Sequence, residues 1–547
     1  LLSGYVMPGN FTSRYDNIGG YENDKWELDD YRLESYLGRA NYIYDEKYYL
    51  SGSFRRDGSS KFIKENRWGT FWSVGAGWRI SSEPWMEGTK TWLDNAKIRT
   101  SYGVTGNQNG VTSYYINPTW TYGVSVWQNK SNGTGRAQTY SLTSPGLVDT
   151  DITWEHVNQF DLGLDFTLLN SRISGAVDYY NNLTTNSLFN QIVSPLANMA
   201  NTTHTRNCAK LRNSGIEFEL SSDIIRKKDF TWNLSFNLTH FSTILVDVPD
   251  SQLPAWDEKT SELPEGTWTS ASETWAMTGG QNAGQGKLYL RGEGRDLYNL
   301  YLYKYAGVDK ATGLPMYWHH VTYGDVNKND AGEYAHGGRY SSYKVGDDVK
   351  TLVSADASQY EYGSATPDIM GGLTSSIRWK NWDFSMVWAF QLGGKFFSRE
   401  FGEMMYRTSS LAADWNYGDS WVAAETVGAT FNETNEGAYF PMQWWANGRT
   451  CRYDGDTIGS WMFTDMALFN ASYLRVKNLT LGYTVPGKVL KRAGISGLRA
   501  YVSADNLIFF SAHKGIDPSL SAVGGFDVAQ CVYPQMANVV LGVKLDF

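Results

Sequence analysis

The chain has 547 residues, a formal net charge of -9 and 19% charged residues, and aromatic residues make up 15% of it. This length exceeds one ordinary globular domain, and the acidic balance argues against nucleic acid as a partner, because binding phosphates needs an excess of Lys and Arg. The 36 Tyr, 22 Trp and 55 Gly residues favour strands and tight turns over helices.

The sequence contains no run that approaches the ~18 consecutive apolar residues of a membrane-spanning helix. A membrane-spanning strand needs only about ten residues, of which every second one is apolar. The start Leu1-Leu2-Ser3-Gly4 has neither a start Met nor a basic region, so we expect a mature, trimmed or partial chain. Cys208, Cys451 and Cys531 are far apart and odd in number, which predicts isolated thiols.

Apolar and polar residues alternate in several segments, which predicts strands with two different faces. In chain order, the clearest segments are 72–80, 160–168, 173–180, 230–239, 498–505 and 538–547. In the last segment, Val539, Leu541, Val543 and Leu545 share a face with Phe547, and we interpret this terminal aromatic residue as a C-terminal barrel signal. A soluble sandwich could also end on such a strand.

The pattern predicts about fifteen strands. They start near residues 33, 48, 70, 96, 154, 172, 214, 230, 298, 314, 368, 382, 471, 498 and 537, with poor alternation at 33, 298 and 314. A change of phase around Lys477-Asn478 predicts a β-bulge.

The predicted connections alternate in length, which is typical of an outer-membrane β-barrel. Short links fall near 45–47, 170–171, 223–229 and 380–381, and long ones near 106–153, 184–213, 241–297, 323–367, 394–470 and 510–536. An odd number of strands ending in the periplasm would place Leu1 outside the cell. We therefore expect the chain to begin in an extracellular loop of a ~22-stranded barrel, without its first ~7 strands.

Seven blocks resemble the SusC/RagA family of TonB-dependent outer-membrane transporters from Bacteroidetes, in family order along most of the chain. They are 41–44 with 48–62 (YYLSGSFRRDGSSKF), 67–80 (RWGTFWSVGAGWRI), 97–108 (KIRTSYGVTGNQ), 154–166, 471–483 (ASYLRVKNLTLGY), 505–507 (DNL) and 515–518 (GIDP).

The resemblance implies an all-β, transmembrane antiparallel barrel with long extracellular loops, located in the bacterial outer membrane. It also implies import of oligosaccharides or peptides, a SusD-like surface lipoprotein as partner, and energy supplied through TonB. We expect residues 1–547 to be the C-terminal part of such a barrel, with the plug, the TonB box and the early strands absent.

Polar positions of the predicted strands would face the lumen, where they set selectivity, while the other face contacts lipid. The lumen-facing candidates are Arg55, Asp57, Arg79, Lys97, Arg99, Asp161, Asp165, Asn233 and Asn237. For any one of them, a hydrated wall packed on a plug is the plainer interpretation. The tryptophans at strand positions, Trp72, Trp78, Trp382 and Trp388, are expected in the membrane-facing band.

Tryptophans also gather in the predicted long loops, where flat rings with a polar edge could stack on sugars or pack against a lipoprotein. These substrate-binding candidates are Trp256, Trp268, Trp275, Trp415, Trp421, Trp444 and Trp445. Packing inside the loops is the alternative interpretation.

The sequence contains no motif that predicts an enzyme or a cofactor, because a His-Glu-x-x-His helix, a Gly-x-Ser-x-Gly elbow and a P-loop are all missing. One calcium candidate spaces oxygen ligands at Asp325, Asn327 and Asn329. It lacks the Gly and Glu of a calcium loop, and an Asx-rich turn is the alternative.

Three functions compete on these observations: an importer barrel, a similar barrel acting as a scaffold in an outer-membrane assembly or secretion complex, and a soluble secreted β enzyme. The motifs report barrel construction, so they do not separate the first two. Co-purifying partners would separate them, and a need for detergent would exclude the third.

Overall fold

A computed structural model provides the coordinates. It describes residues 31–111, 121–128, 136–143, 151–192, 203–247, 267–268, 289–290, 293–310, 313–326, 338–353, 356–398, 401, 452–453, 456–457, 464–490, 494–512, 517–519 and 535–546.

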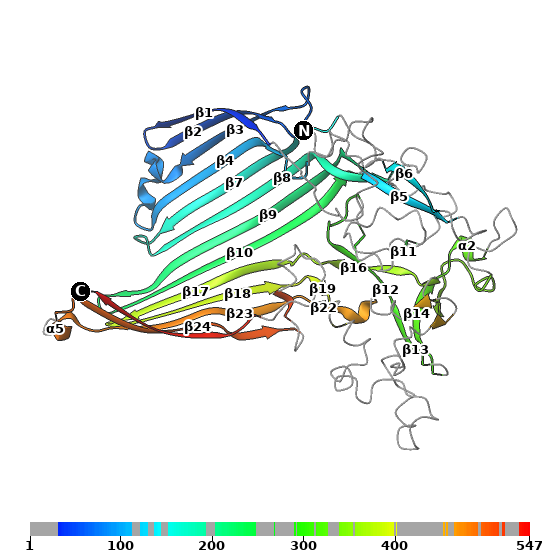
Figure 1. Cartoon of the computed structure of the whole chain (residues 1–547). Coiled ribbons are helices and arrows are strands. Elements are labelled where there is room, and N and C mark those ends of the chain that lie inside the picture. The colour runs from blue at the N-terminus through cyan, green and yellow to red at the C-terminus, as the bar shows by residue number, and fades with distance from the viewer. Residues whose placement is uncertain are drawn as a thin grey trace, which may run out of the picture.

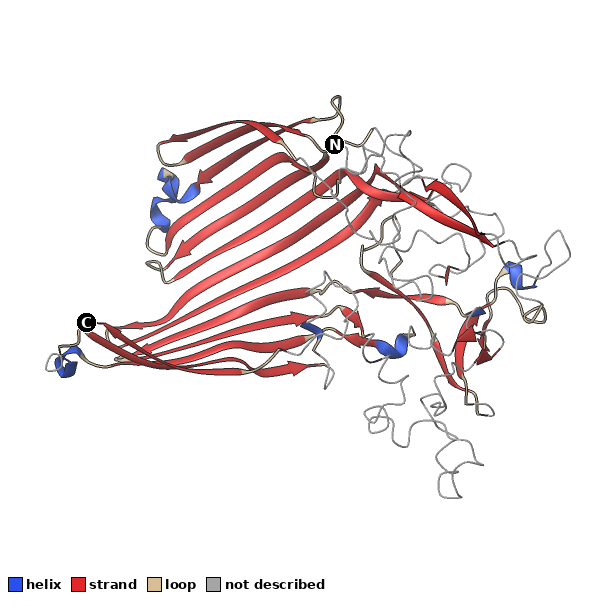
Figure 2. Cartoon of the chain, in the orientation of Figure 1, coloured by secondary structure: helices blue, strands red, loops and turns tan. Residues whose placement is uncertain are grey.

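One large antiparallel sheet of thirteen strands dominates the described structure (Figures 1 and 2). Each strand pairs with its neighbours in chain order, so the sheet is a meander that curves into a wall. Its strands are β1 (Leu33–Tyr44), β2 (Tyr48–Ser59), β3 (Trp68–Arg79), β4 (Leu93–Asn107), β7 (Glu155–Leu168), β8 (Ile173–Ile192), β9 (Thr203–Lys227), β10 (Phe230–Asp247), β17 (Ile369–Trp379), β18 (Trp382–Leu392), β23 (Tyr473–Thr484), β24 (Gly497–Ser511) and β25 (Asn538–Asp546).

The alternation of residue types gives this sheet one apolar and one polar face. Leu164 pairs with Ile98 on β4 and with Val177 on β8, while the neighbouring Asp165 pairs with Lys97. Because side chains alternate across a pleated strand, the register carries each residue type onto the same face of every strand.

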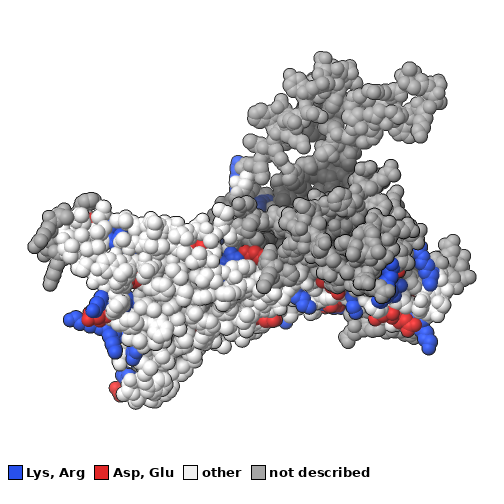
Figure 3. All heavy atoms as spheres, turned by 90° about the horizontal axis from the view of Figure 1, so that it is seen from below, with Lys and Arg blue, Asp and Glu red and all other residues white. Residues whose placement is uncertain are grey.

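The apolar face lies outward and carries large exposed side chains. Among them are Trp72, Val74, Leu162, Leu481 and Leu541. Figure 3 shows a broad region almost free of charged residues, with Lys, Arg, Asp and Glu gathered toward the two ends of the strands. No helix among the described residues is long and apolar enough to cross a membrane.

The two ends of the sheet differ in their connections, as the sequence predicts. At one end, tight turns join β1 to β2, β7 to β8, β9 to β10 and β17 to β18. Three short helices lie in other links there: the 3-10 helices Ile80–Ser82 and Pro84–Thr89, and the helix α5 (Gly487–Leu490). The long connections leave the opposite end (Figure 1).

The predicted strands near 298 and 314 exist but do not belong to the large sheet, so the strand count of about fifteen is corrected to thirteen. They form β12 (Asn299–Tyr303), β13 (Tyr305–Val308) and β14 (Pro315–His320) in small separate sheets. Their burial explains the poor alternation, since β12 is buried on both faces.

The connections between β10 and β17 and between β18 and β23 contain the small sheets named next, except for the last pair, which lies between β4 and β7. Strand β16 (Gln359–Ser364) lies between β11 (Thr267–Trp268) and β12, and β14 lies between β13 and β15 (Asp348–Thr351). The remaining pairs are β19 (Lys395–Phe397) with β22 (Leu468–Asn470), β20 (Arg452–Tyr453) with β21 (Asp456–Thr457), and β5 (Thr121–Gln128) with β6 (Arg136–Thr143). A short helix, α2 (Tyr323–Val326), follows β14.

Most of the predicted loop 184–213 is strand, which is a second correction. Strand β8 continues to Ile192 and β9 begins at Thr203, so β9 reaches 25 residues. About ten residues suffice to cross a bilayer, so both strands extend beyond it. Outside the membrane neither face must be apolar, and the alternation that reveals a spanning strand is lost.

The bulge predicted near Lys477-Asn478 is confirmed. The pairing of β23 shifts register between Val476 and Asn478 against β24, and between Val387 and Trp388 against β18. The extra residue restores Leu479 and Leu481 to the apolar face on which Leu474 lies, whereas Val476 beside the bulge is buried.

Candidate functional site

The polar face of the large sheet brings together the residues predicted to face the lumen. Arg79 pairs with Lys97, and Lys97 with Asp165. The same face carries Arg55, Asp57, Arg99 and Asp161 and, further around the wall, Asn233 and Asn237. Their role in selectivity stays a prediction.

Arg99 is the centre of a charged cluster on this face. Its Nη1 lies 3.2 Å from Asp161 Oδ1 and its Nε 3.3 Å from Asp165 Oδ1. Its Nη2 also donates to Asp178. One guanidinium therefore binds three carboxylates from two strands. All four side chains remain partly exposed on the polar face of the sheet.

Asp178 is a residue that the sequence reasoning did not select. It occupies a polar position of the alternating segment 173–180, so its face could be predicted. Its contact with Arg99 could not, because the pairing of β7 with β8 and of β4 with β7 must both be known.

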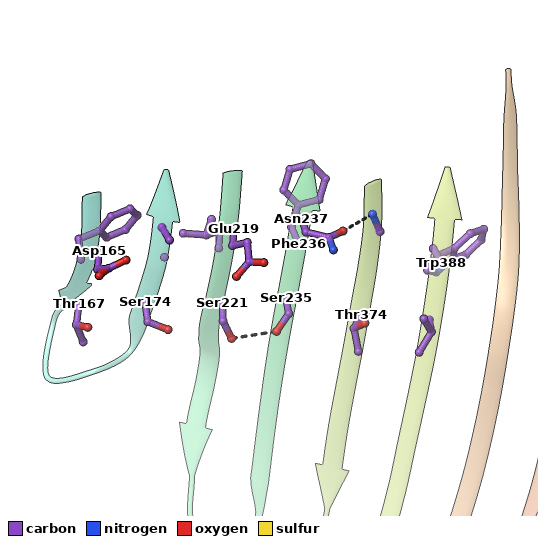
Figure 4. A pocket seen from close by; sticks show the side chains of 16 residues that line it. Asp165, Thr167, Ser174, Glu219, Ser221, Ser235, Phe236, Asn237, Thr374 and Trp388 are labelled. Atoms are coloured by element: carbon purple, nitrogen blue, oxygen red, sulfur yellow. Dashed lines mark hydrogen bonds between the residues drawn. The ribbon is translucent and has the colours of Figure 1, made fainter. Parts of the chain in front are cut away.

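A hollow of about 600 Å³ lies beside this cluster. Figure 4 shows its lining as rows across neighbouring strands. One row contains Thr167, Ser174, Ser221, Ser235 and Thr374, and the next contains Asp165, Glu219 and Asn237.

The hydroxyl groups in the hollow are partly engaged with one another. Ser221 Oγ and Ser235 Oγ lie 2.9 Å apart, and Asn233 Nδ2 donates to Ser221 Oγ at 3.4 Å. A hydroxyl can donate and accept at once, so such a row keeps hydrogen-bonding capacity for a polar solute. The hollow can hold a polar molecule by hydrogen bonds.

A second ion pair lies on the polar face of the later strands. Arg499 Nη2 lies 2.5 Å from Asp383 Oδ2, and Arg499 Nε lies 3.2 Å from Asp383 Oδ1. These two parallel contacts form a bidentate pair, which fixes both side chains. This pair could not be predicted from the sequence, because Arg499 on β24 reaches Asp383 on β18 across the strand β23 that lies between them.

Buried Arg475 ties the connection after β24 to the same wall. Its side chain is 3% exposed, donates to Asp517 and Gln535, and lies 4.3 Å from the centroid of the Phe509 ring. Asp517 also accepts hydrogen bonds from the backbone N and Oγ of Ser519. A single buried cation thus holds both ends of this long connection against the polar face.

At the long-loop end, strands β12, β14 and β19 contribute to one aromatic core, which lies in what we call the loop module, residues 289–368 and 395–470 as far as they are described. Glycines 393 and 394, both at positive φ, make the sharp turn from β18 into it. The buried core consists of Tyr289, Leu300, Leu302, Tyr317, Ala365, Phe397, Phe401, Met466 and Ala467.

Most of the loop tryptophans predicted to bind substrate lie outside the described residues: Trp256, Trp275, Trp415, Trp421, Trp444 and Trp445. The backbone of Trp268 belongs to β11, which pairs with β16. Their role stays a prediction. Phe547, the predicted barrel signal, also lies outside the described residues.

The calcium candidate Asp325 is engaged inside the loop module. Its Oδ2 accepts hydrogen bonds of 2.6 Å from both the backbone N and the hydroxyl of Thr322, and lies 3.2 Å from His319 Nε2. Asn327 and Asn329 lie outside the described residues, so calcium stays a prediction. Within the described part of the chain, no three His, Cys, Asp or Glu side chains are grouped to hold a metal.

The environment of Asp325 favours its charged form. Burial acts to raise the pKa of this carboxyl, but hydrogen bonds from His319 and Thr322 outweigh it, so the pKa lies below the ordinary value. The His319 ring stacks on Tyr340 at 4.0 Å, and burial raises the pKa of that tyrosine. Asp325 is therefore the acceptor that holds β14 to the chain that follows it.

Three comparisons with known proteins agree with this architecture. The family model for the TonB dependent receptor-like β-barrel matches residues 3–306. TonB-dependent receptor SusC of Bacteroides thetaiotaomicron is 28% identical over 520 residues, which cover 94% of this chain and 44% of that protein. TonB-dependent receptor P3 of Formosa agariphila is 25% identical over 531 residues, or 95% of this chain and 46% of that one.

Solved structures show the same fold. The RagAB peptide transporter matches with a TM-score of 0.67 at 24% identity, over 97% of this chain and 50% of that chain. The RagAB peptide importer in its closed-closed state matches with a TM-score of 0.68 at 23% identity, over the same shares. The chain thus spans about half the length of the relatives it matches.

Proposed function

The chain belongs to the TonB-dependent receptor-like β-barrel family of the outer membrane, and on this premise we propose that it forms part of the wall of an importer for large nutrients. The observation that carries the proposal is the two-faced sheet of thirteen strands. Its outward face suits lipid, and its polar face suits a hydrated passage.

The substrate we propose is an oligosaccharide. The polar part of the hollow's lining consists of hydroxyls, carboxylates and an amide, which match the many donors and acceptors of a sugar, and Phe236 and Trp388 add apolar surface. A peptide is the second candidate, because the RagAB structures that share the fold are described as a peptide transporter.

We further propose a SusD-like surface lipoprotein as partner of the loop module, and TonB as the source of energy for the complete protein. The module has its own buried aromatic core, which would hold its surface in a fixed conformation for binding a partner. The matched relatives are receptors, so we propose no enzymatic activity.

The test is to tag the protein in its own cells, extract it with detergent and identify what co-purifies. The same cells, with and without the gene, are then fed fluorescent oligosaccharides and peptides. One surface lipoprotein together with gene-dependent uptake of an oligosaccharide supports the proposal. Several assembly proteins without any uptake defect would favour the scaffold, and gene-dependent uptake of peptides alone would replace the substrate.

A further inference from the structure

Two lysines meet at one tryptophan on the surface of the loop module. Lys304 Nζ lies 5.6 Å and Lys350 Nζ 5.4 Å from the centroid of the Trp318 ring. Lys304 Nζ also lies 5.4 Å from the centroid of the Tyr360 ring. Both lysines are exposed, while the two aromatic rings are partly buried.

The backbone holds this arrangement in place. Trp318 pairs with Lys350 in the register of β14 and β15, and the backbone N of Trp318 donates to the carbonyl of Lys304 at 3.0 Å. On its other side, the carbonyl of Trp318 accepts from the backbone N of Ser358 at 3.0 Å. The two lysines therefore flank the ring because of strand pairing.

Among the described residues, aromatic rings but no carboxylates engage the two ammonium groups. Within the described part of the chain, neither Lys304 nor Lys350 makes an ion pair. The nearby carboxylate of Asp348 accepts instead from the Tyr360 hydroxyl at 3.0 Å and lies 2.9 Å from His320 Nδ1. Two like charges beside one ring repel each other, and a bound anion would relieve that repulsion.

We propose that Lys304, Trp318 and Lys350 form a binding site for an acidic saccharide, one that carries carboxylate or sulfate groups. The ammonium groups would bind the anionic group, and the aromatic rings would contact the apolar faces of the sugar. The inference rests on the proposed import of oligosaccharides and narrows their class. The protein as a whole is acidic, so the attraction is local to this site.

The experiment measures the Kd of tetragalacturonate for the detergent-purified native complex by calorimetry. Lys304→Gln with Lys350→Gln should raise the Kd at least about ten-fold. Lys304→Arg with Lys350→Arg should keep most of the affinity, because the two charges remain. Lys344→Gln is the matched control, since Lys344 is an exposed lysine of the same module without an aromatic partner among the described residues.

Two further probes complete the test: neutral maltotetraose and a tetraglutamate peptide. Weaker binding of tetragalacturonate at high salt, with no binding of maltotetraose, is expected. An unchanged Kd in the double Gln variant, or binding of the peptide alone, overturns the proposal. Gene-dependent uptake of any oligosaccharide in that case would mean that this site fails while the importer stands, and absence of all such uptake would mean that the importer fails, so the two failures are distinguishable.

Discussion

Arg99 shows how the polar wall manages charge at the level of single residues. Three aspartates from β7 and β8 face it, so the cluster keeps an excess of negative charge even with the arginine in place. The side chains are 19–37% exposed, and water screens part of the repulsion among the carboxylates. Arg99 thus weakens the electrostatic repulsion among the three carboxylates of the cluster.

Replacing Arg99 by Met should therefore destabilise the barrel by about 1–2 kcal/mol, a value reduced for the exposure of the cluster. Asp178→Asn in the same chain should restore part of the loss, because it removes one of the repelling carboxylates. Heat-modified mobility in gel electrophoresis gives the unfolding temperature. Arg39→Met, which removes an exposed arginine without an ion pair among the described residues, is the control, and equal effects of both would refute the cluster's role.

Asp325 gives the loop module a predicted sensitivity to acid. Its pKa in the folded protein lies below the ordinary value of about 3.9, so its contribution to stability is complete above that value. It is lost as the pH falls through the lower, folded pKa. The protection factors of the β13–β15 amides, which are corrected for the intrinsic pH dependence of exchange, should therefore fall below about pH 4 and stay constant from pH 5 to 7.

The matched variants for this prediction are Asp325→Asn and Asp347→Asn. The first should lower the protection factors at pH 7 and remove their fall below pH 4, because the acceptor of the Thr322 bonds is no longer a carboxylate. The second replaces an exposed aspartate in a nearby turn and should leave the acid response in place. If the protection factors of Asp325→Asn still fall below pH 4, another titrating group is responsible for the acid response.

At the level of elements, the tight turn between β7 and β8 holds a leucine in an unfavourable conformation. Leu169 has a φ of +57° and its side chain is 46% exposed, so packing does not compensate for the strain. Leu169→Gly should stabilise the barrel by about 1 kcal/mol, since glycine adopts this conformation without a steric penalty. Leu168→Gly, in the preceding extended strand, should destabilise it in the same urea titration. A loss of stability in Leu169→Gly would mean that the side chain contributes contacts here.

The strands that could be predicted from the sequence are those with one face toward lipid and the other toward water, because this difference produces the alternation of apolar and polar residues. The segment 160–168 alternates because one face meets lipid, and the bulge near Lys477 is visible as a break in that alternation. Strand β12 and the outer parts of β8 and β9 meet one environment on both faces, so no alternation marks them. The polar face was predictable residue by residue, but the partners of Arg99 and Arg499 depend on which strands lie side by side.

At the level of the whole molecule, the thirteen strands of the curved wall separate an apolar exterior from a polar interior. The same chain that exposes Leu162 on one face lines the hollow with Thr374 on the other. This arrangement makes sense only if the apolar face contacts lipid and the polar face contacts water or a solute. Its energetic consequence is that an introduced arginine should destabilise the barrel on the apolar face and be tolerated on the polar face.

Arginine placed on each face tests this separation directly. Leu162→Arg should destabilise the barrel by about 2–4 kcal/mol, because it places a charge in the hydrocarbon region. Thr374→Arg should be tolerated, since the hollow of about 600 Å³ has room for the side chain and water to solvate it. The measurement is folding of each full-length variant into lipid vesicles, followed by urea titration of the heat-modified band. Equal losses in the two variants would refute the assignment of the faces, whereas a loss confined to Leu162→Arg means that lipid covers that face and the hollow is open to water.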